Sequence, residues 1–238
     1  MSRFPTTKWT LVNSANSRED PGVRSALSDL CEAYWPPLYA FVRMKGLNKE
    51  DAQDMVQGFF ERLLTKDDLV GVDRGRGRFR SYLMGAINHY MADEWDRAKA
   101  LKRGGGAGHV SLGFDFEKVE RQFEMQAAGR SDPERIFNHR WAIELLNRVL
   151  EYLRAEYGQA GQLERYETLI PFVTGEQDDA TYRDAGQLLG ISEGAARVAA
   201  HRLKRRYKEA VREEVAATVS DERDVEEELL HLMQALSV

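Results

Sequence analysis

The sequence predicts an all-α protein built from two helical domains. Its 238 residues exceed the usual size of a single compact domain. Apolar residues recur at the three- and four-residue spacing of amphipathic helices, and no stretch alternates with the period of two that marks a strand. Four glycines between residues 104 and 108 interrupt the helical pattern, as is typical of a linker. We therefore expect two helical domains with a flexible connection between them.

Three helices are predicted in the first half of the chain. The first covers residues 23–44, where the pair Pro36 and Pro37 must either bend the helix or divide it in two. The second begins just after Asn48, a good N-cap residue, and carries a wide apolar stripe. The third follows a loop rich in glycine and arginine and covers about residues 79–101.

The second half begins with a predicted linker over residues 104–133, which contains at most a short helix. Helices follow over about 134–157 and 161–173. Either Ser131 or Asp132 provides the N-cap of the first of these, because proline and glutamate come next, as in a typical first helical turn.

The most informative motif is a helix-turn-helix over residues 182–198. Its first helix ends at Gly190, which can take the left-handed conformation that a tight turn requires, and Ser192 caps the second helix. We assign the packing between the two helices to small and apolar residues: Ala185, Leu188, Leu189, Ile191, Ala195 and Val198.

The outward face of the second helix holds the candidate DNA contacts. They are Glu193, Arg197, Ala200, His201, Arg202, Lys204 and Arg205. Arg197, near the start of the helix, suits direct readout of a base, and the later basic residues suit the phosphate backbone. The alternative is an ordinary helical hairpin with a basic, solvated face.

Charge is distributed unevenly along this acidic chain, whose net charge is -5. Residues 74–103 hold eight basic and three acidic side chains, a net charge of +5, and residues 197–212 hold seven and one, a net charge of +6. Residues 213–230 hold eight acidic side chains and one basic, a net charge of -7. Two basic segments in an acidic protein indicate two contacts with a polyanion.

Several classes of protein are disfavoured by what the sequence lacks. No apolar run is long enough for a membrane span or a signal peptide, which predicts a cytoplasmic protein without membrane contact. Cys31 is the single cysteine, so an intrachain disulfide and a cysteine zinc cluster are excluded. The five histidines show no metal-binding spacing, and neither a P-loop nor a GxSxG motif is present, so we predict no cofactor, no metal and no enzymatic activity.

The order of these features resembles the extracytoplasmic-function (ECF) group of bacterial sigma-70 family RNA polymerase sigma factors. The segment Lys49–Leu63 looks like the family's polymerase-binding helix, and Phe79–Arg97 looks like the helix that melts and reads the −10 element. The resemblance implies four parts: a sigma region 2-like domain over 8–103, the linker over 104–133, a sigma region 4-like domain for the −35 element over 134–215, and an acidic amphipathic C-terminal helix over 216–238.

The resemblance also implies partners and contact residues. Core RNA polymerase would be bound through the β′ clamp helices and the β flap, and promoter DNA through both domains. Candidate −10 contacts are Arg80, Asn88, His89, Trp95, Arg97, Lys99, Lys102 and Arg103. Candidate polymerase contacts are Asp51, Gln53, Asp54, Gln57, Phe60 and Glu61.

The sequence departs from the family pattern at three positions. His89 stands where the family usually has asparagine, and Gln53 and Gly58 stand where it usually has acids. Phosphorylation of Thr65 would restore negative charge near the same helix face, which would imply a Ser/Thr kinase as a partner, beside an anti-sigma factor. The alternative is that Thr65 is only the last residue of its helix.

Two further alternatives stay open at this point. The C-terminal residues 221–237 form an amphipathic acidic helix that either packs on the C-terminal domain or masks its basic recognition helix. The chain as a whole could instead be a free-standing helix-turn-helix regulator that binds duplex DNA as a dimer.

Overall fold

A computed structural model describes residues 21–65, 78–100, 116–127, 132–176, 181–219 and 221–237. Within these ranges the regular elements are helices, and a single isolated β-bridge joins Arg78 and Val219. The all-α prediction is thereby confirmed. The chain divides into unit 1, residues 1–144 with 216–238, and unit 2, residues 145–215.

Unit 2 differs from the predicted second domain at its start, and both end at residue 215. The predicted second domain began at residue 134, whereas residues 133–144 belong to unit 1. Residues 216–238 also belong to unit 1, so unit 2 is inserted in the sequence of unit 1. The tail contacts the start of the predicted second domain, where Nδ1 of His139 hydrogen-bonds to the carbonyl of Ala235 at 2.8 Å.

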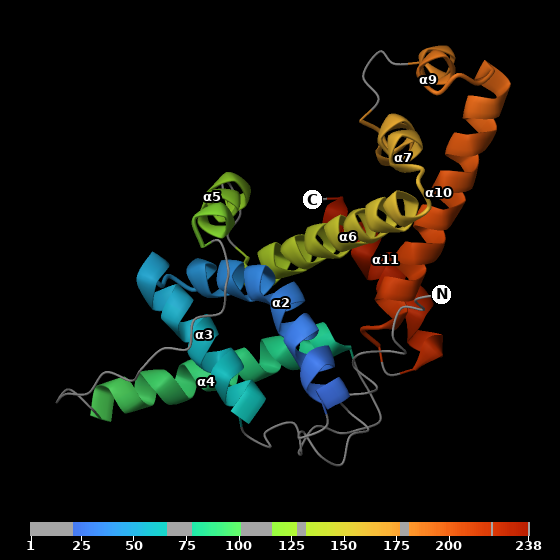
Figure 1. Ribbon diagram of the computed structural model, residues 1–238. Coiled ribbons are helices and arrows are strands. Elements are labelled where there is room, and N and C mark those ends of the chain that lie inside the picture. The colour runs from blue at the N-terminus through green and yellow to red at the C-terminus, as the bar shows by residue number, and fades with distance from the viewer. Residues whose placement is uncertain are drawn as a thin grey trace. The chain divides into compact units, whose positions relative to one another are not determined.

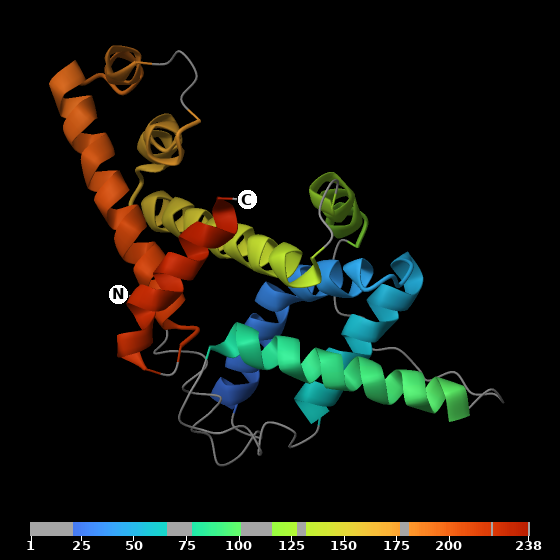
Figure 2. The ribbon, with the colours of Figure 1, turned by 180° about the vertical axis from the view of Figure 1, so that it is seen from behind.

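The first three helices of unit 1 are α2 (Pro21–Met44), α3 (Lys49–Thr65) and α4 (Phe79–Ala100), and α4 crosses the other two (Figure 1). Helix α2 is continuous through Pro36 and Pro37 and bends midway (Figure 2). Of the two predicted alternatives, a bent helix or two separate helices, the structure has the bent helix. The side chain of Asn48 caps α3 as expected, because its Oδ1 accepts the backbone N–H of Asp51 at 2.8 Å.

Buried aromatic rings form much of the core of unit 1. Tyr34 of α2 meets Phe79 of α4 edge to face at 5.0 Å between ring centroids. The Tyr34 hydroxyl also accepts a hydrogen bond from Nε1 of Trp141 at 3.1 Å. Trp141 lies on the first part of α6 (Pro133–Gln159), which ties residues 133–144 to α2. Asp132 caps α6, since its Oδ1 accepts the N–H of Glu134 at 2.9 Å.

Helix α5 (Phe116–Ala127) lies within the predicted linker and is docked on α2 and α3. The buried carboxylate of Glu120 accepts hydrogen bonds from Nη2 of Arg43 at 2.7 Å and from the Tyr39 hydroxyl. Lys49 pairs with Glu117 at 2.5 Å. Burial alone would raise the pKa of Glu120, but the bonds from Arg43 and Tyr39 bring it below its usual value. Residues 116–127 are therefore a packed part of unit 1.

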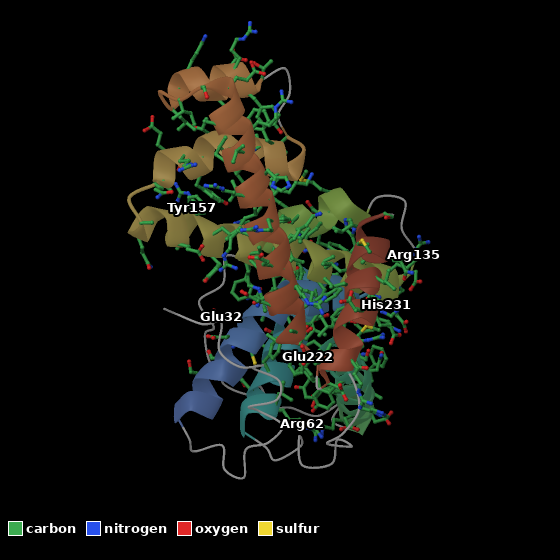
Figure 3. All side chains as sticks on the ribbon, turned by 90° about the vertical axis from the view of Figure 1, so that its right-hand side faces the viewer. Glu32, Arg62, Arg135, Tyr157, Glu222 and His231 are labelled. Atoms are coloured by element: carbon green, nitrogen blue, oxygen red, sulfur yellow. The ribbon has the colours of Figure 1, made fainter. Side chains whose placement is uncertain are left out.

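The C-terminal segment is fixed to unit 1 by a buried carboxylate. Glu228, on α11 (Val225–Leu236), has no exposed surface. It accepts two hydrogen bonds from Arg80, at 2.6 and 3.0 Å, and pairs with Nε of Arg78 at 3.0 Å. His231 of α11, labelled in Figure 3, lies 3.8 Å from the same carboxylate. The backbone N–H of Phe79 adds a hydrogen bond to the carbonyl of Thr218 at 3.1 Å.

Unit 2 contains the rest of α6, followed by α7 (Leu163–Leu169), α8 (Pro171–Thr174), α9 (Tyr182–Leu188) and α10 (Glu193–Ala216, up to Val215). The predicted helix over 161–173 is divided at Ile170, because Pro171 cannot continue a helix and instead starts α8. Figure 1 shows α9 beside the N-terminal end of α10.

We predict that breaking the Glu228 pair costs far more stability than breaking its exposed neighbour. Glu228→Gln leaves Arg80 buried without its counter-charge, so the free energy of unfolding should fall by about 3–5 kcal/mol. Glu227 pairs with Arg78 but is exposed, and Glu227→Gln should cause a much smaller loss. Urea unfolding of both variants measures the difference, and equal losses would contradict the assignment.

We also predict an acid-sensitive docking of α5. Since the pKa of Glu120 is lowered in the folded state, its stabilisation is complete above the unfolded value of about 4.3 and is lost as the pH falls through the folded value. Glu120→Gln should lower stability at pH 7 and flatten the loss of stability below about pH 4.3. Tryptophan fluorescence during urea unfolding reports it, with Glu124→Gln, an exposed acid on the same helix, as the control.

Candidate nucleic-acid interface

Local interactions define the helix-turn-helix of unit 2 at the start of α9, in the turn and at the start of α10. Thr181 and Asp184 form a capping box at the start of α9, in which the Thr181 Oγ1 accepts the N–H of Asp184 at 3.3 Å. The Asp184 carboxylate in turn accepts hydrogen bonds from the Thr181 hydroxyl at 2.6 Å and from its backbone N–H at 2.9 Å, and these two bonds lower the pKa of Asp184. Gly190 has the predicted left-handed conformation, with φ of 64°. Ser192 caps α10 as predicted, because its Oγ accepts the N–H of Ala195 at 3.2 Å.

Gly186 allows the two helices to approach closely. A Cβ at this position would lie 2.8 Å from the carbonyl oxygen of Ile191 and 3.3 Å from the nitrogen of Glu193, and both are backbone atoms. Ala185 and Gly186 are the buried residues of α9, whereas Leu188 is largely exposed. The small pair, rather than the leucines, therefore makes the contact between α9 and the turn.

The register of α10 corrects the predicted packing by one residue. Ala196, Ala199 and Leu203 are buried, whereas Ala195 is exposed and Val198 is 52% exposed. The predicted DNA contact Ala200 is only 3% exposed and belongs to the core. The surface at the start of α10 consequently presents small and apolar side chains.

The exposed face of α10 forms a basic stripe at helical spacing. Its members are Arg197, His201, Lys204, Arg205, Lys208 and Arg212. These positions lie three or four residues apart and so share one face, over about 22 Å at 1.5 Å per residue. Arg202 is exposed beside the stripe. Among the residues that the structure describes, Arg202, Lys204 and Lys208 make no ion pair, while Arg205 lies 3.6 Å from Glu209. The predicted residues other than Ala200 are therefore accessible.

Other charged residues of α10 attach it to α6. Arg206 hydrogen-bonds to Glu156 at 2.7 Å and to the Tyr152 hydroxyl at 3.1 Å. The bond from Arg206 lowers the pKa of Glu156. Arg148 pairs with the buried Glu214 at 2.6 Å. Arg206 counts toward the net charge of this segment but is a structural residue.

Arg197 has a defined environment that sequence reasoning missed. Its Cζ lies 5.3 Å from the centre of the Tyr182 ring, and its Nη2 donates to Glu193 at 3.2 Å. Tyr182 stacks in turn on Phe172, with 4.5 Å between centroids and 19° between planes. The four-residue spacing of Glu193 and Arg197 signals the ion pair, but no spacing rule signals the ring.

Unit 1 presents a second predicted interface along α4, with one correction. Arg80 is only 8% exposed and is held by Glu228, so it does not belong to a DNA-binding surface. Asn88 and His89 are exposed, and Trp95 is 45% exposed. Arg97 is exposed and pairs with Glu94 at 2.5 Å. The predicted contacts Lys102 and Arg103 lie outside the described residues, as does the side chain of Lys99.

The predicted polymerase-binding residues of α3 separate into two groups. Asp51 and Asp54 are exposed, and Gln53 and Glu61 are partly exposed. Gln57 and Phe60 are buried, Phe60 completely, because the apolar stripe of α3 is turned into the core. Gln57 and Phe60 are therefore not part of a polymerase-binding surface. The side chain of Thr65 lies outside the described part of the structure.

Gly58, where the family pattern has an acid, lies against α4. A Cβ there would lie 2.5 Å from the hydroxyl oxygen of Tyr90, and that ring also lies under Arg62 at 5.7 Å. Arg62 pairs with Asp93 at 3.0 Å. A larger residue at position 58 would require the hydroxyl end of the Tyr90 side chain to move.

In the described part of unit 1, one small cavity and one buried thiol are the features to consider for catalysis. A cavity of about 220 Å³ is lined by Arg80, Arg135, Asn138, His231, Gln234 and Ala235, two of which are labelled in Figure 3. Its volume is below the range of about 300–1,000 Å³ for typical ligand pockets. Burial raises the pKa of the Cys31 thiol to about 12, which makes a thiolate nucleophile unfavourable.

Over the described ranges, no three His, Cys, Asp or Glu side chains are grouped so as to hold a metal ion. In the same ranges, no helix is both long and apolar enough to cross a membrane. Comparison of the chain with protein-family models, curated proteins and solved structures finds no match.

We predict opposite effects of alanine at two glycines of the helix-turn-helix. Gly186→Ala forces a Cβ against backbone atoms that cannot move independently, and should cost about 1–3 kcal/mol of stability. Gly194→Ala meets no atom within 4 Å and should stabilise α10 by about 0.4–1 kcal/mol. Thermal unfolding followed by circular dichroism measures both. A neutral Gly186→Ala would show that the α9 contact is looser than described.

Proposed function

We propose that this protein is an alternative sigma factor of the ECF type, which binds core RNA polymerase and directs it to chosen promoters. The observation that carries the proposal is the helix pair α9–α10, a capped helix-turn-helix whose second helix exposes a basic stripe. An α-helix of this kind fits the major groove, and phosphate contacts from lysine and arginine would hold it there.

The surface at the start of α10 suits base readout at the −35 element. Gly194, Ala195 and Val198 are exposed and small, which would let the helix backbone approach the base edges, and an apolar side chain can contact a thymine methyl group. Arg197 on the same surface can donate two hydrogen bonds to a guanine. Lys204, Arg205 and Lys208 then lie farther along the helix for phosphate contacts.

Unit 1 would supply the −10 and polymerase contacts. Trp95 offers an exposed aromatic face for an unstacked base, with Asn88, His89 and Arg97 exposed on the same helix. Asp51 and Asp54 offer carboxylates to a basic surface of the polymerase. In this role the protein performs no chemistry of its own, and the nucleotidyl transfer belongs to the polymerase.

The second candidate is a free-standing dimeric regulator. Leu230, Met233 and Leu236 of α11 are exposed, and an apolar edge of this kind is favourable for association. Such a regulator would bind paired half-sites in duplex DNA without polymerase.

The test is co-elution of the purified full chain with bacterial core RNA polymerase on a sizing column at moderate salt. We expect a stoichiometric complex. Asp51→Lys combined with Asp54→Lys should weaken it, because both charges are reversed at the proposed contact. Glu124→Lys is the control, since it changes an exposed acid on α5 that is not assigned to the contact.

The sigma assignment would be overturned by the absence of a complex together with binding of a dimer to palindromic duplex DNA, which would establish the regulator. The α3 contact alone would be overturned by a complex that Glu124→Lys weakens as much as the α3 double variant.

A further inference from the structure

We propose that Tyr182 and Glu193 are positioning residues, which hold Arg197 in the orientation for reading one guanine. This inference rests on the proposed DNA-binding function of α10 and identifies the base and the residues that set the preference for it. It is carried by the geometry around the Arg197 guanidinium.

The Tyr182 ring supports one side of the guanidinium. The Cζ of Arg197 lies 5.3 Å from the ring centre, within the distance at which a cation is attracted to an aromatic face. The ring itself is held by Phe172, stacked on it at 4.5 Å, and by its place in the first turn of α9 after the Thr181 capping box. The support is therefore fixed to the helix-turn-helix before any ligand binds.

The Glu193 carboxylate limits the remaining freedom of the same group. Its Oε1 accepts the hydrogen bond from Nη2 of Arg197 at 3.2 Å, and its Oε2 lies 3.8 Å from Nε of Arg183. Glu193 and Arg197 are one helical turn apart, so the pair forms without displacing the backbone. A ring and a carboxylate thus restrain one guanidinium.

Arg197 is restrained but accessible, and this combination suits base readout. Its side chain remains 66% exposed. Arginine reads guanine through two hydrogen bonds to O6 and N7, which require the planar guanidinium in one orientation. A free arginine side chain loses much rotamer freedom on reaching that orientation, whereas a restrained one has lost part of it already. The restraint should therefore increase the preference for guanine at a single position.

The experiment begins with duplexes that the wild-type full chain selects from a random library. Arg197→Ala identifies the guanine, as the position at which this variant loses its preference. Tyr182→Leu should reduce the preference for guanine at that position about two- to fivefold, the loss expected for one exposed cation–π contact, and leave the other positions unchanged. Tyr182→Phe keeps the ring and should keep the wild-type preference.

Glu193→Gln separates positioning from simple charge. Removal of a negative charge close to DNA should increase affinity for non-specific duplex, while the guanine preference at the Arg197 position decreases. A purely structural role of Tyr182 would lower affinity for all sequences and the helical signal in circular dichroism. Under the positioning role, Tyr182→Leu leaves the affinity for non-specific duplex and the helical signal unchanged.

The outcomes distinguish the inference from the function on which it rests. If the wild type selects no sequence, both are wrong. If it selects a sequence but Arg197→Ala or Tyr182→Leu leaves every position unchanged, DNA recognition stands and the positioning role is wrong.

Discussion

The buried carboxylate of Glu228 is the constraint on which unit 1 depends. A carboxylate without exposed surface requires counter-charges and hydrogen bonds, and Arg80 and Arg78 supply both from the start of α4. Asn138 of α6 binds the same Arg80 at 2.6 Å, so segments distant in the sequence meet at one group. This network places the C-terminal segment in unit 1, and it removes two arginines from the surface that nucleic acid could reach.

The same network shows why local net charge does not identify a nucleic-acid surface. The basic segment 74–103 includes Arg78 and Arg80, whose charges are used inside the protein, whereas the stripe on α10 is exposed along its length. Even on α10, Arg206 turns back to Glu156. What matters for a polyanion is the charge that remains accessible once internal pairs have formed. Among the described residues, α10 therefore exposes more basic side chains than α4 does.

Local features were predictable from the sequence because local interactions determine them. The caps at Asn48 and Ser192 and the left-handed Gly190 each depend on neighbours within a few residues. The face of α10 was assigned wrongly because Ala195, Ala196, Ala199 and Ala200 place small residues all around the helix, so periodicity does not define a buried side. The partner of Glu228 could not be predicted, because 148 residues separate it from Arg80.

The candidate site depends on the same distinction between local and distant interactions. Gly186 brings α9 close to the turn, Gly190 reverses the chain, and the capping box fixes the first turn of α9, which contains Tyr182. Together these features set the distance between Tyr182 and Arg197. Each of them fixes the course of the backbone, and none contacts DNA in the proposed complex. The orientation of a base-reading side chain is then a consequence of how tightly the turn closes, so mutations in the turn should change sequence preference as well as stability.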